Sequence, residues 1–199
     1  AYRNSGTATI SYSLYDHSMY NITPTNSDNS SNPNFTNAAS DDFTINASST
    51  ACINTGTSGG GIPAYDLVQA LRPYGGGYDM GCYEYSPVYY WVGGTGNWSD
   101  YTNHWSNSTG GAAGSFGNAP TSSDNVIFDA NSSGTVTIDA IANCYNFTST
   151  GSTATIAGAN DVNVYGSITL GSGFTWSNTG TLTLAAPSTG KEIQTNSIT

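Results

Sequence analysis

Short apolar segments separated by turn residues fill the chain from residue 125 onward, and their spacing restricts the fold more than any other feature. Each segment is too short for a long amphipathic helix, and Gly, Ser and Asn lie between segments. Alternation of apolar with polar residues is typical of half-buried strands. The sequence therefore predicts an all-β fold. The segments are Val126–Phe128, Val136–Ile138, Tyr145–Phe147, Ile156, Val162–Val164, Ile168–Leu170, Phe174–Trp176, Leu182–Leu184 and Ile193.

A repeat of 18 residues results when residues 146–148, 164–166 and 182–184 are aligned. One coil of a β-solenoid has a similar length, so the alignment predicts a solenoid of stacked coils. An antiparallel β-sandwich also repeats its strands, roughly every 8 to 12 residues. The spacing favours the solenoid and leaves the sandwich as the alternative.

Charged residues are scarce, at 8% of the chain, against about 25% in typical globular proteins. The net charge is −10, and the only bases are Arg3, Arg72 and Lys191. Nucleic acids and anionic membranes both attract clustered Lys and Arg, so the sequence excludes nucleic acid and electrostatic docking to lipid. The acids could hold a structural calcium ion, or they could serve solubility alone.

Aromatic residues make up 12% of the chain, which indicates an ordered protein despite the low charge. No apolar run is long enough to cross a bilayer, so we expect no membrane insertion. We expect any export or anchoring signals to lie outside this sequence.

The first part of the chain has fewer periodic features. Ile10, Tyr12 and Leu14 alternate with polar residues and predict one strand, and a long stretch rich in Asn and Ser follows. The segment Asp66–Leu71 predicts a single helical turn, and no part of the chain predicts a longer helix.

Several short motifs occur in a fixed order in the first half of the chain. Their order resembles the C-terminal end of right-handed parallel β-helix proteins of bacterial surfaces, a family in which the anchoring domain varies. The resemblance implies that residues 1–86 form the terminal coils and the cap of such a helix, so that its edge is not left open. Asn34 departs from the family, which usually has an apolar residue there. The motifs are residues 10–14 (ISYSL), 32–37 (NPNFTN), 42–45 (DFTI), 49–56 (STACINTG), 72–73 (RP) and 79–84 (DMGCYE).

A second group of motifs follows at residues 91–100 (WVGGTGNWSD), 104–106 (HWS) and 124–129 (DNVIFD). This group resembles a repeat-rich module common in extracellular multidomain proteins of the Bacteroidota. The resemblance implies that residues 87–199 form a β-rich, solenoid-like repeat domain, which we expect to be cut short at its C-terminus. Neither family has a well-defined enzyme activity, so both imply location and architecture.

Cys52 and Cys82 lie in motifs that the first resemblance assigns to one cap. In an exported protein we expect a disulfide between them, with two buried free thiols as the alternative. Cys144 is expected to be a buried small residue, with an intermolecular bridge as the alternative. No cysteine pair has zinc-ligand spacing, and two histidines are too few for a zinc site.

The acidic residues form no pattern of an active site. Asp41 with Asp42, and Asp79 with Glu84, are expected to accept hydrogen bonds from turn N–H groups. The three bases lie too far apart in sequence for the site of a polysaccharide lyase, and no Gly-x-Ser-x-Gly motif occurs. We therefore predict no enzyme activity and no cofactor other than structural calcium.

Trp91, Trp98 and Trp105 recur at intervals of seven residues, with Tyr101 and His104 between the last two. This pattern predicts a hydrophobic cap on the first coil of a solenoid, which repeat folds require. The alternative is a carbohydrate site in which Trp98, Trp105 and Tyr101 stack on sugar rings.

Asn-x-Ser/Thr triplets, the acceptor sequence for N-glycosylation, recur along the chain. Asn, Ser and Thr are so abundant that chance explains most of them. They mark candidate sites only, at Asn21, Asn29, Asn34, Asn46, Asn97, Asn107, Asn131 and Asn146.

Taken together, these features predict a non-enzymatic structural module of a bacterial surface protein, located outside the cell. We expect a rod-like spacer or a subunit of a self-assembling filament, with a carbohydrate-binding adhesin module as the alternative. The expected partners are copies of the chain or neighbouring domains of a longer one, and glycans in the adhesin alternative.

Overall fold

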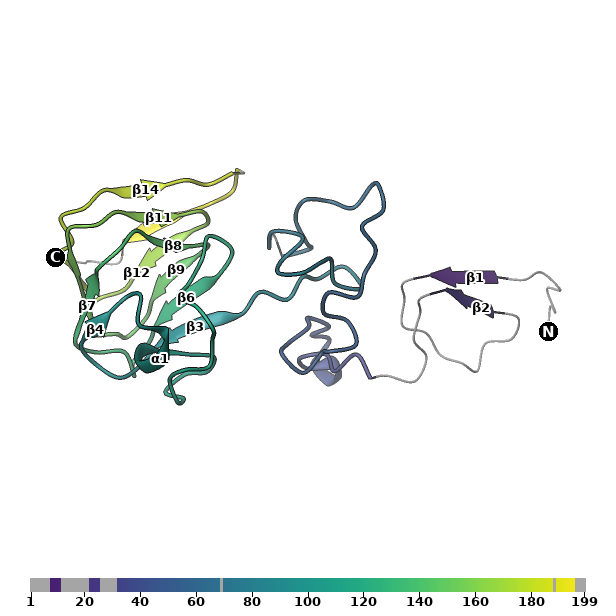
Figure 1. Ribbon diagram of the computed structural model, residues 1–199, viewed down its shortest axis with the longest axis horizontal. Helices are drawn as coiled ribbons and strands as arrows, with labels where there is room; N and C mark the ends of the chain where they lie inside the picture. The colour runs from purple at the N-terminus through teal and green to yellow at the C-terminus, as the bar shows by residue number, and fades with distance from the viewer. Residues whose placement is uncertain (1–7, 12–21, 26–31, 69, 188, 196–199) are drawn as a thin grey trace. The chain divides into compact units, whose positions relative to one another are not determined.

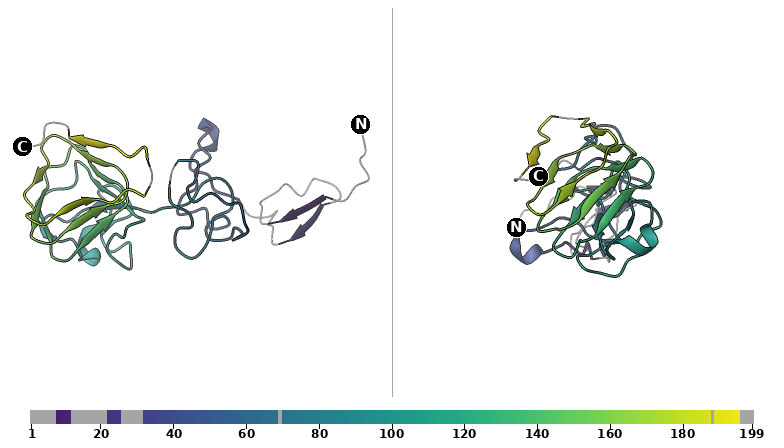
Figure 2. Two further views of the ribbon diagram at one scale, coloured as in Figure 1. Left: turned by 90° about the horizontal axis from the view of Figure 1, so that it is seen from above. Right: turned by 90° about the vertical axis from the view of Figure 1, so that its left-hand side faces the viewer.

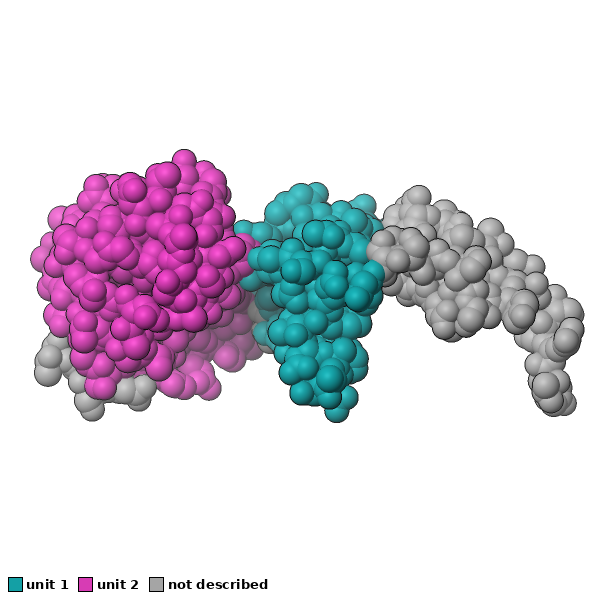
Figure 3. Space-filling model, turned by 90° about the horizontal axis from the view of Figure 1, so that it is seen from below, with its two compact units in different colours: residues 1–86 teal, residues 87–199 magenta. Residues whose placement is uncertain are grey.

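The chain divides into two compact units, residues 1–86 and 87–199, which are coloured separately in Figure 3. The division falls where the sequence placed the change from one group of motifs to the next. The structure is a computed structural model, and it describes residues 8–11, 22–25, 32–68, 70–187 and 189–195.

Unit 2 (residues 87–199) is a β-solenoid, as the sequence predicted. Pairing between successive coils is parallel, which rules out the antiparallel sandwich. The right-hand view of Figure 2 shows the strands of successive coils side by side. Its strands are β3 (Val88–Trp91), β4 (Gly96–Asn97), β5 (Trp105–Ser106), β6 (Asn125–Phe128), β7 (Thr135–Ile138), β8 (Ala142–Cys144), β9 (Phe147–Ser149), β10 (Thr155–Gly158), β11 (Val162–Val164), β12 (Ile168–Leu170), β13 (Thr175–Trp176), β14 (Leu182–Leu184) and β15 (Ile193–Thr195).

The strands belong to three sheets, and a complete coil adds one strand to each. The first sheet has the order β5-β3-β6-β9-β12-β15, the second β4-β7-β10-β13 and the third β8-β11-β14. Among the described strands of unit 2, only β5 runs antiparallel to its neighbour, β3. The sheets therefore grow in the direction of the chain, from β3 at one end to β13, β14 and β15 at the other (Figure 1).

From β6 to β14 the coils are 20 to 21 residues long, whereas β3 pairs with β6 at an offset of 37 residues and β12 with β15 at an offset of 25. Val136 pairs with Ile156, an offset of 20 residues, and Phe147 pairs with Ile168, an offset of 21. The predicted period of 18 residues is wrong. Its alignment placed Phe147 over Tyr165, but Phe147 belongs to the first sheet whereas Tyr165 follows β11 of the third.

The core of unit 2 is a stack of inward-facing apolar side chains. Successive residues of a strand point to opposite faces, so alternate residues of each strand face the interior. Val136, Ile156, Val162 and Val164 are fully buried in this way. Burying apolar side chains on every coil is the main stabilising contribution to such a fold.

Amide side chains form ladders between coils. The Nδ2 of Asn163 donates to Oδ1 of Asn143 at 3.1 Å, and the Nδ2 of Asn146 donates to Oδ1 of Asn125 at 2.7 Å. Equivalent positions on neighbouring coils lie one strand spacing apart, which suits an amide-to-amide hydrogen bond. These ladders explain how a chain with few charges satisfies its polar side chains.

Among its described residues, unit 1 (residues 1–86) contains one regular strand pair. Strand β1 (Ala8–Ser11) runs parallel to β2 (Ile22–Thr25). Residues 32–68 and 70–86 form turns, isolated bridges and one 3-10 helix, Ala38–Ser40, which matches the predicted irregular capping loops. Tyr12 and Leu14, which were predicted to continue a strand with Ile10, lie outside the described residues.

The predicted helical turn at residues 66–71 is wrong. An antiparallel bridge between Tyr65 and Leu71 closes this segment into a loop. The Oδ1 of Asp66 accepts hydrogen bonds from the N–H groups of Val68 and Ala70, at 2.9 and 2.7 Å. A carboxylate that binds nearby N–H groups stabilises a turn in competition with a helix.

The buried stack predicts a contrast between two isoleucines of unit 2. Ile156 is 0% exposed and Ile141 is 61% exposed. Ile156→Ala should lower the free energy of unfolding by about 2–5 kcal/mol, because it leaves a cavity. Ile141→Ala should change it by less than about 0.5 kcal/mol. Urea denaturation followed by tryptophan fluorescence measures both values, and equal losses would contradict the inward assignment of Ile156.

Candidate functional site

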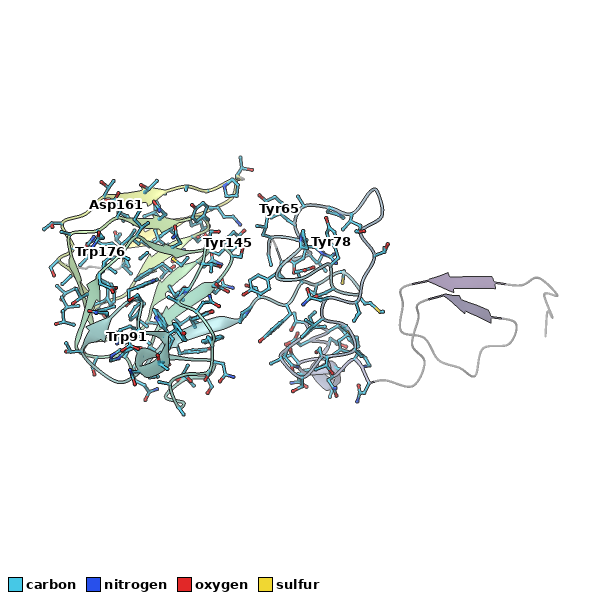
Figure 4. The ribbon with its side chains drawn as sticks, viewed as in Figure 1. Tyr65, Tyr78, Trp91, Tyr145, Asp161 and Trp176 are labelled. Carbon is cyan, nitrogen blue, oxygen red and sulfur yellow. The ribbon has the colours of Figure 1, made fainter. Side chains whose placement is uncertain are left out.

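The first coil of the solenoid holds a cluster of tryptophans. Trp91 and Trp105 are fully buried, and their ring centroids lie 5.1 Å apart in an edge-to-face arrangement. Trp98 packs against Trp105 at 4.9 Å and is nearly as buried. The Nε1 of Trp105 donates to the carbonyl of Trp98 at 2.8 Å, so the buried indole N–H has a partner. Trp91 is labelled in Figure 4.

A short helix brings the last tryptophan into place. Asp100 caps α1 (Tyr101–His104) and accepts a hydrogen bond from the N–H of Asn103 at 3.2 Å. Hydrogen bonds from Asn103 lower the pKa of Asp100. After α1 the chain reverses, and β5 pairs with β3 through Tyr90 opposite Ser106. Figure 1 shows α1 beside β3.

Strand β5 covers the outer edge of the first strand of the solenoid. Without it β3 would present unpaired N–H and C=O groups, which invite strand addition from another chain. Trp105 lies on β5 itself and packs against Trp91 of β3, so β5 and the cluster together form a cap on the first coil. This arrangement is the predicted hydrophobic cap.

The alternative role of these residues in carbohydrate binding is wrong for Trp98 and Trp105. Both rings lie inside the core, where a sugar ring has no access. Tyr101 is partly buried and packs against the same core. An aromatic platform for sugar needs an exposed ring face, which Trp98 and Trp105 do not offer.

His104 also belongs to the cap, a role that the sequence did not predict for it. Its ring stacks on that of Trp91, with the ring centroids 4.7 Å apart and the planes nearly parallel, and its Nδ1 lies 3.2 Å from the carbonyl oxygen of Val92. A Cβ atom at Gly96 would lie 1.9 Å from Nε2 of His104, so only glycine fits there. The glycines of the motif at residues 93–96 were the sequence signal for this close packing.

The C-terminal end of the solenoid lacks an equivalent cover. Strands β13, β14 and β15 are each the last strand of their sheet in the described chain. Leu182, Leu184 and Ile193 occupy inward positions on these strands, yet they are 37%, 44% and 62% exposed. At the first coil β5 covers one of the three sheets, and β4 and β8 are the outermost described strands of the other two.

Buried carboxylates in unit 1 form a second cluster. The Oε2 of Glu84 accepts a hydrogen bond from Nε of Arg72 at 2.9 Å, and its Oε1 accepts one from the N–H of Tyr74 at 2.7 Å. Asp79 accepts hydrogen bonds from the N–H groups of Asn54 and Tyr85, at 2.7 and 2.5 Å. These bonds to turn N–H groups are the role predicted for Asp79 and Glu84.

The surroundings of Asp79 have opposing effects on its pKa. Burial raises its pKa, and the hydrogen bonds from Tyr85 and Asn54 act in the opposite direction. Asp42 also binds a turn, accepting from the N–H of Thr44 at 3.0 Å, and hydrogen bonds from Thr44 lower its pKa. The oxygens of Asp42 and Asp79 are thus used in holding loops, as a structural role requires.

An open cavity of about 280 Å³ lies beside this cluster and is lined partly by Arg72, Tyr78 and Asp79. The guanidinium of Arg72 donates to Glu84 and to the carbonyls of Asp79 and Gly81. The wall of the cavity also contains three glycines and a proline. The Arg72 guanidinium and the Asp79 carboxylate, which both line the cavity, therefore already have hydrogen-bond partners elsewhere in the cluster. We assign no catalytic chemistry to the cavity.

In the part of the chain that the structure describes, no three His, Cys, Asp or Glu side chains come close enough together to hold a metal ion. Calcium also takes amide and backbone oxygens, so the structural calcium ion stays a prediction.

The predicted disulfide between Cys52 and Cys82 is wrong, because both residues are free thiols. Cys52 is buried with its Sγ 4.0 Å from the carbonyl oxygen of Pro33, whereas Cys82 is exposed. Cys144 lies in β8 and is fully buried, as predicted. Burial raises the pKa of Cys52 and of Cys144, which suppresses the reactive thiolate.

The candidate glycosylation sites differ in accessibility. Asn46 and Asn146 are half-buried, and Asn146 belongs to an amide ladder that a glycan would break. Asn21 and Asn29 lie outside the described residues. The exposed sites are Asn34, Asn97, Asn107 and Asn131.

Comparison with known proteins gave no match to a family model, to a curated protein or to a solved structure. The two family resemblances therefore stay predictions. Across the described residues, no helix has the length and apolar character needed to cross a membrane.

The environments of the cysteines predict their reactivity. In the native protein a thiol reagent should modify Cys82 rapidly, and should modify Cys52 and Cys144 only after denaturation. Titration with Ellman's reagent and mass spectrometry would count and locate the modified residues. Two results would instead support the disulfide between Cys52 and Cys82: no reactive thiol in the native protein, and one reactive thiol after denaturation without reductant.

The buried ion pair predicts a selective loss of stability in unit 1. Glu84→Gln should destabilise this unit by about 3–5 kcal/mol, because it leaves the Arg72 guanidinium buried without a charged partner. Faster labelling of Cys52 would report the loss. The melting temperature measured by tryptophan fluorescence should be unchanged, because the four tryptophans all lie in unit 2. Glu192→Gln, at an exposed position, is the control, and equal effects of both substitutions would contradict the role of the pair.

Proposed function

We propose that this protein is a non-enzymatic structural module of a bacterial surface protein and acts as a rod-like spacer. The observation that carries the proposal is the repeated coil of unit 2. From β6 to β14 the coils stack on one another at offsets of 20 to 21 residues, with the same inward columns of apolar residues. A stack of this kind sets a distance by the number of its coils.

The cap on the first coil favours a spacer over a filament subunit. A head-to-tail filament of solenoids would need both ends open, so that the last coil of one copy could pair with the first coil of the next. Strand β5 occupies the edge of β3, which is one of the three strands, with β4 and β8, that such a contact would use.

The roles of the acidic residues support a non-enzymatic function. Asp66, Asp79 and Glu84 are buried, and each accepts hydrogen bonds from backbone N–H groups. General acid–base catalysis needs a carboxyl group that can reach a substrate. These three are used within the loops of unit 1.

The location outside the cell rests on composition and on the two resemblances. A surface of hydroxyls and amides, with 8% charged residues, suits a secreted repeat module. The expected partners are neighbouring domains of a longer chain.

The adhesin alternative has lost the residues on which it depended. With Trp98 and Trp105 in the core, a carbohydrate site would need other side chains. The exposed aromatic pair in unit 1, Phe35 and Phe43, packs edge to face at 5.5 Å and does not form a flat platform. The spacer is therefore the better supported function.

Removal of one coil tests the spacer directly. Deleting residues 139–158 joins Ile138 to Ala159 and keeps the register, because Ile138 pairs with Gly158. The shortened protein should remain folded, with a lower melting temperature and a smaller hydrodynamic radius. Circular dichroism and light scattering measure both properties.

Deleting residues 139–148 is the matched control, because it removes half a coil and turns the following strands onto the wrong sheets. This variant should lose cooperative unfolding. If the full-coil deletion unfolds unit 2 as completely as the half-coil deletion, the coils are not interchangeable and the spacer proposal fails.

A further inference from the structure

The cavity of unit 1 contains one polar group that the surrounding loops leave without a partner. The side chain of Arg72 lines this cavity and is only 7% exposed. Its Nε donates to Glu84 at 2.9 Å, and its Nη2 donates to the carbonyls of Asp79 and Gly81 at 3.0 and 3.1 Å. Among the described residues, no group accepts a hydrogen bond from the third nitrogen, Nη1.

This nitrogen is not sealed inside the protein. In the described chain, the buried side-chain atoms that lack a hydrogen bond are the hydroxyl of Ser149 and the amide oxygen of Asn178, both in unit 2. Nη1 of Arg72 is not one of them, so solvent reaches it. A guanidinium is planar and donates in fixed directions. Since Nε and Nη2 are held by the loops, Nη1 is the donor that Arg72 directs into the cavity.

The charges around Arg72 restrict the ligand of this donor to a neutral group. Glu84 forms an ion pair with Arg72, and the charge of Asp79 interacts with both. Two carboxylates therefore surround one guanidinium, in a chain whose net charge is −10. They would repel an anion, and Nη1 would repel a cation. A neutral hydrogen-bond acceptor avoids both repulsions.

The rest of the wall favours a short aliphatic group beside the acceptor. Ile62, Pro63 and Met80 supply apolar surface. The ring of Tyr78, which is labelled in Figure 4, has its centroid 5.9 Å from Cζ of Arg72. At about 280 Å³ the cavity is slightly smaller than the pockets of about 300–1,000 Å³ that hold drug-sized ligands. It therefore has room for one small group.

We propose that this cavity binds a small neutral amide whose carbonyl oxygen accepts a hydrogen bond from Nη1 of Arg72. An amide carbonyl is a strong neutral acceptor, and a charged donor strengthens the bond. The aliphatic part of the ligand contacts Ile62, Pro63 and Met80. The amide is either the primary amide of a free small molecule or a secondary amide of the peptide type, since both present the same oxygen. This binding goes beyond the spacer function and does not depend on it.

NMR titration of the full chain with propionamide tests the proposal. The chain has two arginines, Arg3 and Arg72, so an Arg3→Lys background assigns the remaining arginine Nε–H resonance to Arg72. Bound propionamide should shift this resonance in a saturable way, because Nε and Nη1 belong to one delocalised group. A resonance that stays in place, or that drifts linearly without saturation, overturns the proposal.

A second ligand, N-methylpropionamide, separates the two sources of the amide. It carries a secondary amide of the peptide type. Saturable shifts with both amides would show that the carbonyl oxygen alone is recognised, and would support a peptide-type ligand. A saturable shift with propionamide alone would assign the cavity to primary amides.

Propionate tests the neutrality of the ligand, because it has nearly the shape of propionamide but carries a negative charge. It should bind at least about tenfold more weakly, because Asp79 and Glu84 repel it. Equally tight binding of propionate and propionamide would overturn the assignment to a neutral amide.

A pair of substitutions in one loop tests the location. Thr57 and Ser58 are both exposed, but only Thr57 belongs to the wall of the cavity. Thr57→Tyr should raise the dissociation constant of propionamide at least about tenfold, because the added ring occupies the cavity. Ser58→Tyr is the matched control and should leave it unchanged. Circular dichroism checks that both variants fold, and equal effects of the two substitutions would overturn the proposed site.

Discussion

Parallel pairing between successive coils is the interaction on which the rest of unit 2 depends. Each strand gives its backbone hydrogen bonds to the coils before and after it, and the same register places apolar side chains in continuous inward columns. The outward positions can then be filled by Asn, Ser and Thr, which bind one another along the stack. A fold of this kind needs few charges, because its polar side chains find partners on neighbouring coils.

The same interaction creates a problem at the ends of the stack, where strands have a neighbour on one side only. At the first coil the chain solves it locally, by returning through α1 and β5 and by filling the interior with tryptophans. At the last coil the columns end in exposed Leu182, Leu184 and Ile193. The difference between the ends gives unit 2 a direction.

Charge has a local structural use in this protein. In unit 1 the carboxylates of Asp66, Asp79 and Glu84 bind backbone N–H groups and organise loops that contain little regular secondary structure. The single base among the described residues of that unit, Arg72, bonds to Glu84 within the cluster. The carboxylate oxygens of these acids are thus occupied by backbone N–H groups within the loops.

The sequence by itself determined the all-β class, the solenoid in preference to the sandwich, and the capping role of the tryptophans. These follow from local alternation, turn residues and the spacing of large aromatic side chains, which act over a few residues. Only the tertiary structure decided the coil length, the free state of Cys52 and Cys82, and the turn formed by Asp66. Each of these depends on which distant backbone groups meet. The 18-residue alignment matched residues on different sheets, because similar strands occur on all three sides of a coil. The sequence likewise could not show whether the thiols of Cys52 and Cys82 meet. In the folded chain Cys52 is buried against Pro33, whereas Cys82 faces solvent.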